Sequence, residues 1–148
     1  MHSYTETKLL PYSPAQIFAL VADIEQYPEF LPWCRAARVV RREGDGAFLG
    51  ELIISFSHLT ERYTSRVVPV PPAGDAAGSI EVSLVDGPFK TLANHWRFVP
   101  KDGGCEIQLE LEFEFKSKLL DRLIGSMFER ATTKMVGAFT ARAEALYG

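Results

Sequence analysis

The sequence predicts an α+β fold in which a curved antiparallel sheet of about seven strands wraps around one long C-terminal helix. Residues 106–115 alternate strictly between apolar and polar side chains, which is typical of a strand in a sheet covered on one face. Residues 117–146 carry apolar side chains at helical spacing, which predicts about eight turns of helix. A helix laid on a one-sided sheet is the economical way to bury both apolar surfaces.

The N-terminal part predicts one strand and two short helices. Residues 4–10 have the alternating character of a first strand. Ser13 followed by Pro14 is typical of a helix N-cap and first helical position, and apolar residues at helical spacing continue the helix over residues 15–24. Pro28 and Pro32 leave room for at most one further helical turn between them.

The middle of the chain predicts six strands separated by turns rich in Gly and Pro. The first of these strands ends with residues 39–40, before the turn at residues 43–46. The other five span residues 48–57, 63–70, 80–85, 92–99 and 106–115. We interpret the Pro- and Gly-rich residues 69–78 as a loop within the sheet, so we expect a single domain over residues 1–148. Gly125 and Gly137 lie inside the long helix at a cost of about 1 kcal/mol each relative to alanine. We expect them to let another element or a ligand come close.

Composition excludes several classes of protein. A net charge of −3 argues against a protein whose main role is to grip a nucleic acid backbone, although a local basic patch remains compatible with it. Two cysteines are too few for a disulfide scaffold or a zinc ribbon, so we expect free thiols in a reducing compartment. The chain has no apolar run of about 20 residues and no signal peptide pattern. We expect a cytoplasmic protein, and any contact with a membrane would be peripheral, at its inner face.

The sequence shows no signature of an enzyme. His2, His58 and His95 have no ligand spacing, and neither a Gly-rich phosphate loop nor a Gly-x-Ser-x-Gly elbow is present. We therefore expect no catalytic residue, no metal and no cofactor. A Cys–His nucleophile pair stays open at this point, although Cys34 beside Trp33 is typical of a buried, inert thiol.

Several motifs along the chain resemble one known family. They are Tyr12-Ser13, residues 21–34 with the specific run Tyr27-Pro28-Glu29-Phe30-Leu31-Pro32-Trp33-Cys34, and residues 61–67, 86–90, 96–98, 113–117 and 128–131. In this order they resemble the coenzyme Q-binding START-domain family, which includes the RatA ribosome association toxins. The resemblance implies the helix-grip fold of START-like proteins. A polyketide cyclase label attached to many relatives rests on fold and does not imply an activity.

The resemblance implies two alternative functions. The first is non-enzymatic binding of ubiquinone or a related polyprenyl lipid in a hydrophobic cavity, as a chaperone or carrier that supports respiratory electron transport or quinone biosynthesis. The alternative is a toxin that binds the large ribosomal subunit and blocks subunit association. Neither implies DNA as a partner.

A polyprenyl lipid needs a dry cavity, which in this fold lies between the concave face of the sheet and the long helix. The candidate lining residues are Phe30, Trp33, Leu52, Ile54, Phe56, Leu92, Trp96, Phe98, Leu109, Leu111, Phe113, Met127, Phe128 and Met135. Each is equally compatible with an ordinary core position. The segment from Phe30 to Trp33 forms either a lid that touches the membrane or a structural cap over the open end of the core.

Basic side chains gather in two places, which are candidates for a membrane or partner surface. These residues are Arg35, Arg38, Arg42, Lys116, Lys118 and Arg122. Strand alternation places Arg38 and Arg42 on one face of their strand and Arg35 and Arg41 on the other. Such clusters bind anionic lipid headgroups or ribosomal RNA phosphates, or are ordinary surface charge.

Overall fold

Seven strands form one antiparallel sheet in the order β1-β7-β6-β5-β4-β3-β2. The computed structural model describes residues 1–56 and 58–148, so the predicted strand end at residue 57 lies outside the described residues. The strands are β1 (His2–Leu10), β2 (Cys34–Arg42), β3 (Phe48–Phe56), β4 (Leu59–Val70), β5 (Gly78–Asp86), β6 (Phe89–Lys101) and β7 (Gly104–Phe115). β1 and β2 lie at the two edges, because β1 pairs with β7.

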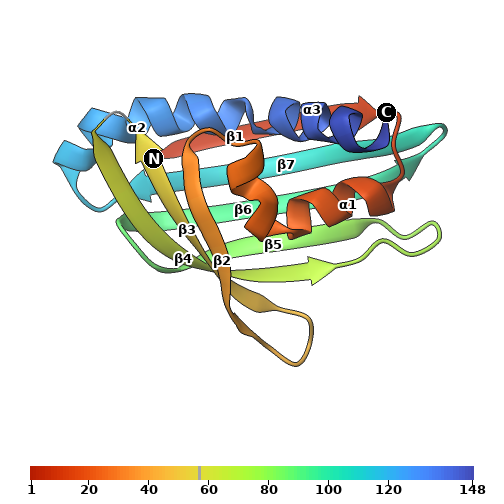
Figure 1. Cartoon of the computed structure of the whole chain (residues 1–148), viewed down its shortest axis with the longest axis horizontal. Coiled ribbons are helices and arrows are strands. Elements are labelled where there is room, and N and C mark those ends of the chain that lie inside the picture. The colour runs from red at the N-terminus through yellow and green to blue at the C-terminus, as the bar shows by residue number, and fades with distance from the viewer. Residues whose placement is uncertain (57) are drawn as a thin grey trace.

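The sheet is strongly curved and holds all the helices on its concave side (Figure 1). Register shifts interrupt the ladders at four places, twice in β2 and once each in the β4–β5 and β6–β7 pairs. Such bulges bend a strand and increase its twist. Glu110 and Glu112 are exposed on the outer face while Leu109, Leu111 and Phe113 are buried, which confirms the predicted one-sided sheet.

Two short helices follow β1, as predicted. α1 (Pro14–Ala22) begins with Ser13, whose side chain accepts a hydrogen bond from the backbone N–H of Gln16, while the Gln16 side chain accepts one from Ser13. η1 (Ile24–Glu29) is a 3₁₀-helix that comes earlier than the predicted turn and contains Pro28. The Tyr27 hydroxyl donates to the carbonyl of Val21 at 2.5 Å, which ties η1 back onto α1.

The prediction of one uninterrupted C-terminal helix is wrong. The structure has two helices, α2 (Lys118–Thr133) and α3 (Met135–Tyr147), which lie end to end along the sheet (Figure 1). The hydroxyls of Thr132 and Thr133 donate to the carbonyls three residues earlier, each at 2.9 Å, and Lys134 bonds back to Ala131 at 3.2 Å. Such side-chain bonds and three-residue backbone bonds bend a helix or tighten its last turn.

Neither glycine of the C-terminal segment causes the break. Gly125 is buried, and a Cβ there would lie 3.1 Å from the carboxylate of Asp121 and 3.3 Å from Nε2 of His2. The lack of a side chain at Gly125 thus lets α2 come close to His2 of β1, as expected for this glycine. A Cβ on Gly137 would meet nothing within 4 Å.

Candidate functional site

The concave face of the sheet carries an aromatic cluster centred on Phe128 of α2. Its ring lies 4.7 Å from Phe113, 5.5 Å from Phe89 and 5.9 Å from Phe56, measured between ring centroids. Trp33 completes this side at 6.0 Å and stacks on Phe56. Edge-to-face pairs, such as those of Phe128 with Phe113 and Phe56, add stability beyond the area they bury.

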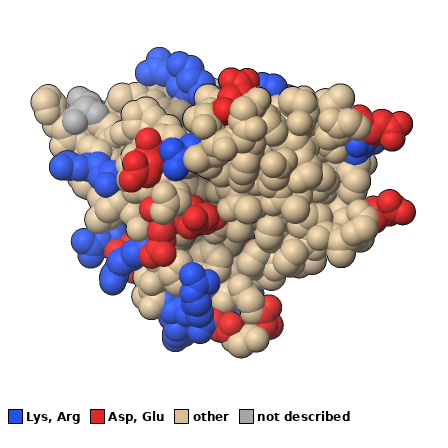
Figure 2. Space-filling model, turned by 45° about the vertical axis from the view of Figure 1, so that its right-hand side comes forward, with Lys and Arg blue, Asp and Glu red and all other residues tan. Residues whose placement is uncertain are grey.

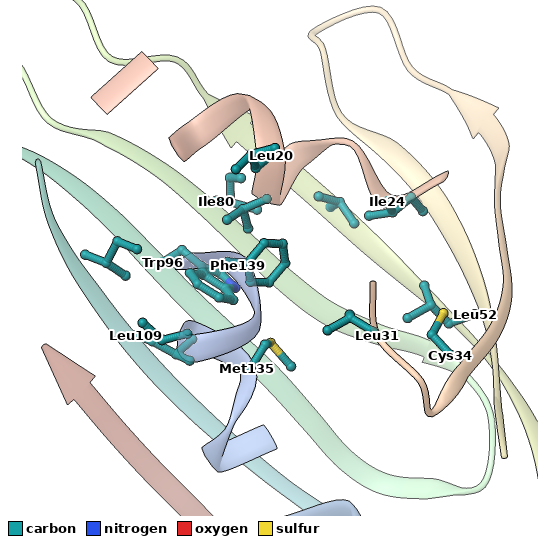
Figure 3. Packing of buried hydrophobic residues seen from close by; sticks show 14 of the residues in the cluster. Leu20, Ile24, Leu31, Cys34, Leu52, Ile80, Trp96, Leu109, Met135 and Phe139 are labelled. Atoms are coloured by element: carbon teal, nitrogen blue, oxygen red, sulfur yellow. The ribbon is translucent and has the colours of Figure 1, made fainter. Parts of the chain in front are cut away.

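A second group centres on Phe139 of α3. Its ring lies 5.5 Å from Trp96 and 5.2 Å from Phe30. In Figure 3, Phe139, Trp96, Leu109 and Met135 converge between the sheet and α3. Residues far apart in the sequence thus meet in one apolar interior under the two C-terminal helices.

The predicted lining residues all belong to this interior or its margin. The buried ones are Leu52, Ile54, Leu92, Trp96, Phe98, Leu109, Leu111, Phe113, Phe128 and Met135, and the half-buried ones are Phe30, Trp33, Phe56 and Met127. Many of these side chains pack directly against one another through the ring contacts described above. That they line a ligand cavity remains a prediction.

The segment from Phe30 to Trp33 packs as a cap on the core. Leu31 is buried, Trp33 lies between Phe56 and Phe128, and Phe30 lies between Phe139 and the guanidinium of Arg142 at 5.3 Å. These contacts favour the structural cap over the membrane-touching lid, the two alternatives that the sequence left open.

Two polar side chains on the concave face were not among the predicted site residues. Ser65 is only 3% exposed, and its hydroxyl has no hydrogen-bond partner among the described residues; the same holds for the side-chain carbonyl of Asn94. The alternation of inward and outward residues along each strand could have identified both side chains from the sequence. Ser65 occupies an inward position between Tyr63 and Val67 on β4, and Asn94 an inward position between Leu92 and Trp96 on β6.

Three of the hollows on the surface of the described residues lie beside the sheet or α1. One of about 560 Å³ lies on the outer face of the sheet around Ala93 and Glu110, and one of similar volume lies between α1 and the β2–β3 hairpin. A third, of about 320 Å³, lies between α1 and α3 beside Arg142. Of the predicted lining residues, only Leu111 and Phe30 line any of these three hollows.

The arginines of the edge strand β2 are arranged differently from the prediction. Arg38 bonds Glu51 on the outer face at 2.9 Å, whereas Arg42 lies over the ring of the buried Phe48 at 5.7 Å. The pairing of Arg41 with Leu49 places it on the same outer face as Arg38. The prediction that Arg38 and Arg42 point together is wrong, because the bulge between Val39 and Arg41 shifts the alternation by one residue.

Positive charge is only partly neutralised near β2. Arg35, Arg41 and Arg42 are exposed, and hydrogen bonding by Arg38 lowers the pKa of Glu51. Lys116, Lys118 and Arg122, at the start of α2, are exposed as well. Figure 2 shows Lys and Arg along the left and lower margins of its view, interspersed with acidic side chains, beside a broad area with few charges.

The thiols and histidines do not form a nucleophilic centre in the described structure. Burial raises the pKa of both Cys34 and Cys105 to about 11, so both thiols are protonated at neutral pH. His95 lies 2.9 Å from Glu81 on the outer face, as a hydrogen-bonded sheet residue. Over residues 1–56 and 58–148, no group of three or more His, Cys, Asp or Glu side chains is arranged to hold a metal ion. No helix of this part of the chain is long and apolar enough to cross a membrane.

The chain is similar to known proteins over nearly its whole length. The sequence model of the family described as "Polyketide cyclase / dehydrase and lipid transport" matches residues 10–140. The ribosome association toxin RatA of Rickettsia prowazekii is 42% identical over 97% of this chain and 97% of its own length. The mitochondrial coenzyme Q-binding protein COQ10 homolog B of Xenopus laevis is 33% identical over 98% of this chain and 59% of its own length.

Solved structures share the fold. A START superfamily protein from Mycobacterium smegmatis superposes with a TM-score of 0.76 at 22% identity, over 99% of both chains. At this identity the likeness concerns the fold alone. The curved sheet with C-terminal helices on its concave side is the helix-grip arrangement that the sequence predicted.

Proposed function

Because this chain belongs to the polyketide cyclase/dehydrase and lipid transport family, we propose that it binds ubiquinone or a related polyprenyl lipid between the sheet and the C-terminal helices. It acts as a carrier without catalysis, in the cytoplasm, and supports respiration or quinone synthesis. The name of the Xenopus relative, a coenzyme Q-binding protein, supports the choice of ligand.

The observation that carries this proposal is the pair of unpaired polar atoms on the apolar concave face. A buried hydroxyl or amide without a partner destabilises a protein by about 1–3 kcal/mol, so such groups usually have a water or a ligand to bind. β5 alone separates Ser65 from Asn94, which corresponds to about 10 Å between their strands. The Ser65 hydroxyl can donate to a ring oxygen of a quinone, and the Asn94 carbonyl can accept from a ring hydroxyl of its reduced form, while the tail lies among the aromatic side chains.

Energetics favour exchange with a membrane rather than with water. Each CH₂ transferred from water gains about 0.8 kcal/mol, so a free polyprenyl tail in water is very unfavourable. Transfer from a lipid bilayer to an apolar pocket is close to neutral, which permits both loading and release. Met127 and Met135 are flexible and polarizable, and they suit an interior that opens for a tail.

Mass spectrometry of an organic extract of the purified protein tests the proposal. We expect a polyprenyl quinone at near-equimolar amount, and none above background in an extract of an unrelated protein prepared in parallel. If the extract is empty, the purified protein is mixed with quinone-loaded vesicles, reisolated and extracted again. A second empty extract contradicts the proposal.

A second candidate is docking on the ribosome. The name of the Rickettsia relative, a ribosome association toxin, and the arginine-rich edge strand β2 both favour it. Exposed arginines that contact RNA phosphates release counterions, so binding to the large subunit would weaken steeply with salt, whereas retention of a lipid would not. Cosedimentation with ribosomal subunits over a series of salt concentrations separates the two candidates.

A further inference from the structure

We propose that the outward face of α2 docks on an anionic membrane by inserting Leu119 and Leu123 among the lipids. This goes beyond the proposed function, because it names a surface outside the interior and holds whatever the protein carries. Contact of Phe30 and Trp33 with a membrane was one of the two alternatives that the sequence left open, but these residues pack on the core.

The two leucines form an exposed apolar pair. Leu119 is 59% exposed and Leu123 is 50% exposed, and residues four apart on a helix are neighbours on one face. The helix already buries a different face, through Ile124, Phe128 and Thr132, against the sheet. The leucines therefore contribute little to the packing of α2, and their exposure has no structural benefit.

Basic side chains surround this pair. Lys118 and Arg122 directly precede Leu119 and Leu123 and are exposed, as is Arg130 two turns further along α2, and Lys116 is exposed just before the helix begins. Each basic residue near an anionic membrane surface strengthens binding about fivefold. Aliphatic side chains flanked by Lys and Arg are typical of helices that lie in the membrane interface.

The acidic residues of α2 both bond a side chain of β1. Its only two, Asp121 and Glu129, both reach the ring of His2, at 3.0 and 2.7 Å. His2 itself stacks on Phe113 at the edge of the core. His2 of β1 thus engages both carboxylates of α2, while Glu129 itself stays 48% exposed. Asp86, the exposed last residue of β5, lies two residues before Pro88, whose carbonyl accepts a hydrogen bond from the backbone N–H of Lys116 just before α2.

The leucines favour a bilayer over RNA as the occupant. Phosphates on RNA would bind the same lysines and arginines, but exposed aliphatic side chains add nothing to that contact and would be left in water. A bilayer with anionic headgroups accepts both kinds of side chain at once. Two inserted leucines and three or four cations produce reversible attachment, as a peripheral protein requires.

Cosedimentation with vesicles tests this surface. The probes are vesicles of phosphatidylcholine alone and of phosphatidylcholine mixed with phosphatidylglycerol. We expect the chain to bind the mixed vesicles, and the double variant Leu119→Asp, Leu123→Asp to bind them at least tenfold more weakly. The matched control is Leu9→Asp, which changes an equally exposed leucine (62%) at the far end of β1 and should bind as the unchanged chain does. Both substitutions are at exposed positions, and circular dichroism verifies the fold.

Charge reversal supplies a second, independent variant. Lys118→Glu with Arg122→Glu should abolish the preference for phosphatidylglycerol. The proposal is overturned if the double leucine variant binds like the unchanged chain, or if neither kind of vesicle is bound while ribosomal subunits are. The quinone extract is measured on the same samples, so failure of membrane docking and failure of lipid carriage are distinguished.

Discussion

Nδ1 of His2 lies 2.7 Å from a carboxylate oxygen of Glu129, 127 residues away in the sequence. In either neutral tautomer, one ring N–H donates to one carboxylate, Glu129 or Asp121. The ring also stacks on Phe113 with 4.5 Å between centroids. This contact connects the edge strand β1 to α2, and so fixes one side of the interior.

Replacing His2→Ala should lower the free energy of unfolding by about 1–2 kcal/mol, because it removes the stack and leaves two carboxylates close together. Urea unfolding measures the effect. His95→Ala is the matched control, since His95 also pairs with a glutamate but on the outer face, where such pairs contribute less than about 1 kcal/mol. Equal losses in the two variants would contradict the role of His2 as a link.

Removing the unpaired hydroxyl of Ser65 should affect the stability of the protein and its retention of quinone in opposite directions. Ser65→Ala removes no hydrogen bond from the ligand-free protein, so its stability should stay the same or rise by up to about 1 kcal/mol. Quinone retention should fall about tenfold if that hydroxyl bonds the ligand. Thr132→Ala is the control: its buried hydroxyl donates to Glu129 at 2.9 Å, so its loss should lower stability and leave retention unchanged. Retention unaffected by Ser65→Ala, and by Asn94→Leu as well, would exclude these two residues as ligand contacts.

Charge placed in the interior should prevent lipid retention. Met135 is buried beside Phe139 at the start of α3, where a lysine would put an ammonium group against the lipid tail. We expect Met135→Lys to be empty in the extraction assay although folded by circular dichroism. The adjacent exposed change Lys134→Met should retain quinone fully. A folded Met135→Lys protein that still holds its quinone would remove Met135 from the lining residues.

The buried thiols should react slowly. A pKa raised from 9.0 to about 11 by burial lowers the thiolate fraction of Cys34 about 100-fold at pH 8, and the folded chain also shields the sulfur. The unfolded chain keeps the ordinary pKa of 9.0, so between pH 9 and 11 its Cys34 loses a proton that the folded chain retains. The free energy of unfolding is therefore unaffected by this thiol below pH 9 and falls as the pH rises from 9 towards 11. Iodoacetamide labelling, followed by mass spectrometry, should be at least 100-fold slower in the native protein than in urea. Comparable rates would indicate an accessible, reactive thiol.

The sequence predicted those parts of the fold that depend on local pattern. The alternation of Glu110 and Leu111 determines which face of β7 is buried, and the capping residues around Ser13 determine where α1 begins. The break at Lys134 and the shifted arginines of β2 were not predictable in this way. The break accompanies the bonds that the hydroxyls of Thr132 and Thr133 make to the preceding turn, and the shifted arginines follow from a single-residue bulge, which leaves no clear pattern in the sequence.

The candidate site shows the same division. Apolar positions from Leu52 to Met135 were found because inward-facing residues repeat with the period of their element. Ser65 and Asn94 interrupt that pattern, and reading the alternation strictly would have identified them. The exposure of Leu119 could not be read from the sequence, because the wide apolar stripe of the helix does not show which of its residues meet the sheet.

Charge reversal on the edge strand decides whether ribosome docking uses β2. Arg35 and Arg41 are both exposed, and each RNA phosphate contact contributes about 0.7 to the slope of log affinity against log salt for single strands. Arg35→Glu with Arg41→Glu should therefore weaken sedimentation with the large ribosomal subunit at least tenfold and flatten its salt dependence. Lys8→Glu with Arg97→Glu makes the same change in net charge at exposed positions on β1 and β6 and should have much less effect. Equal losses in the two double variants would mean that net charge, and not the β2 edge, governs the interaction.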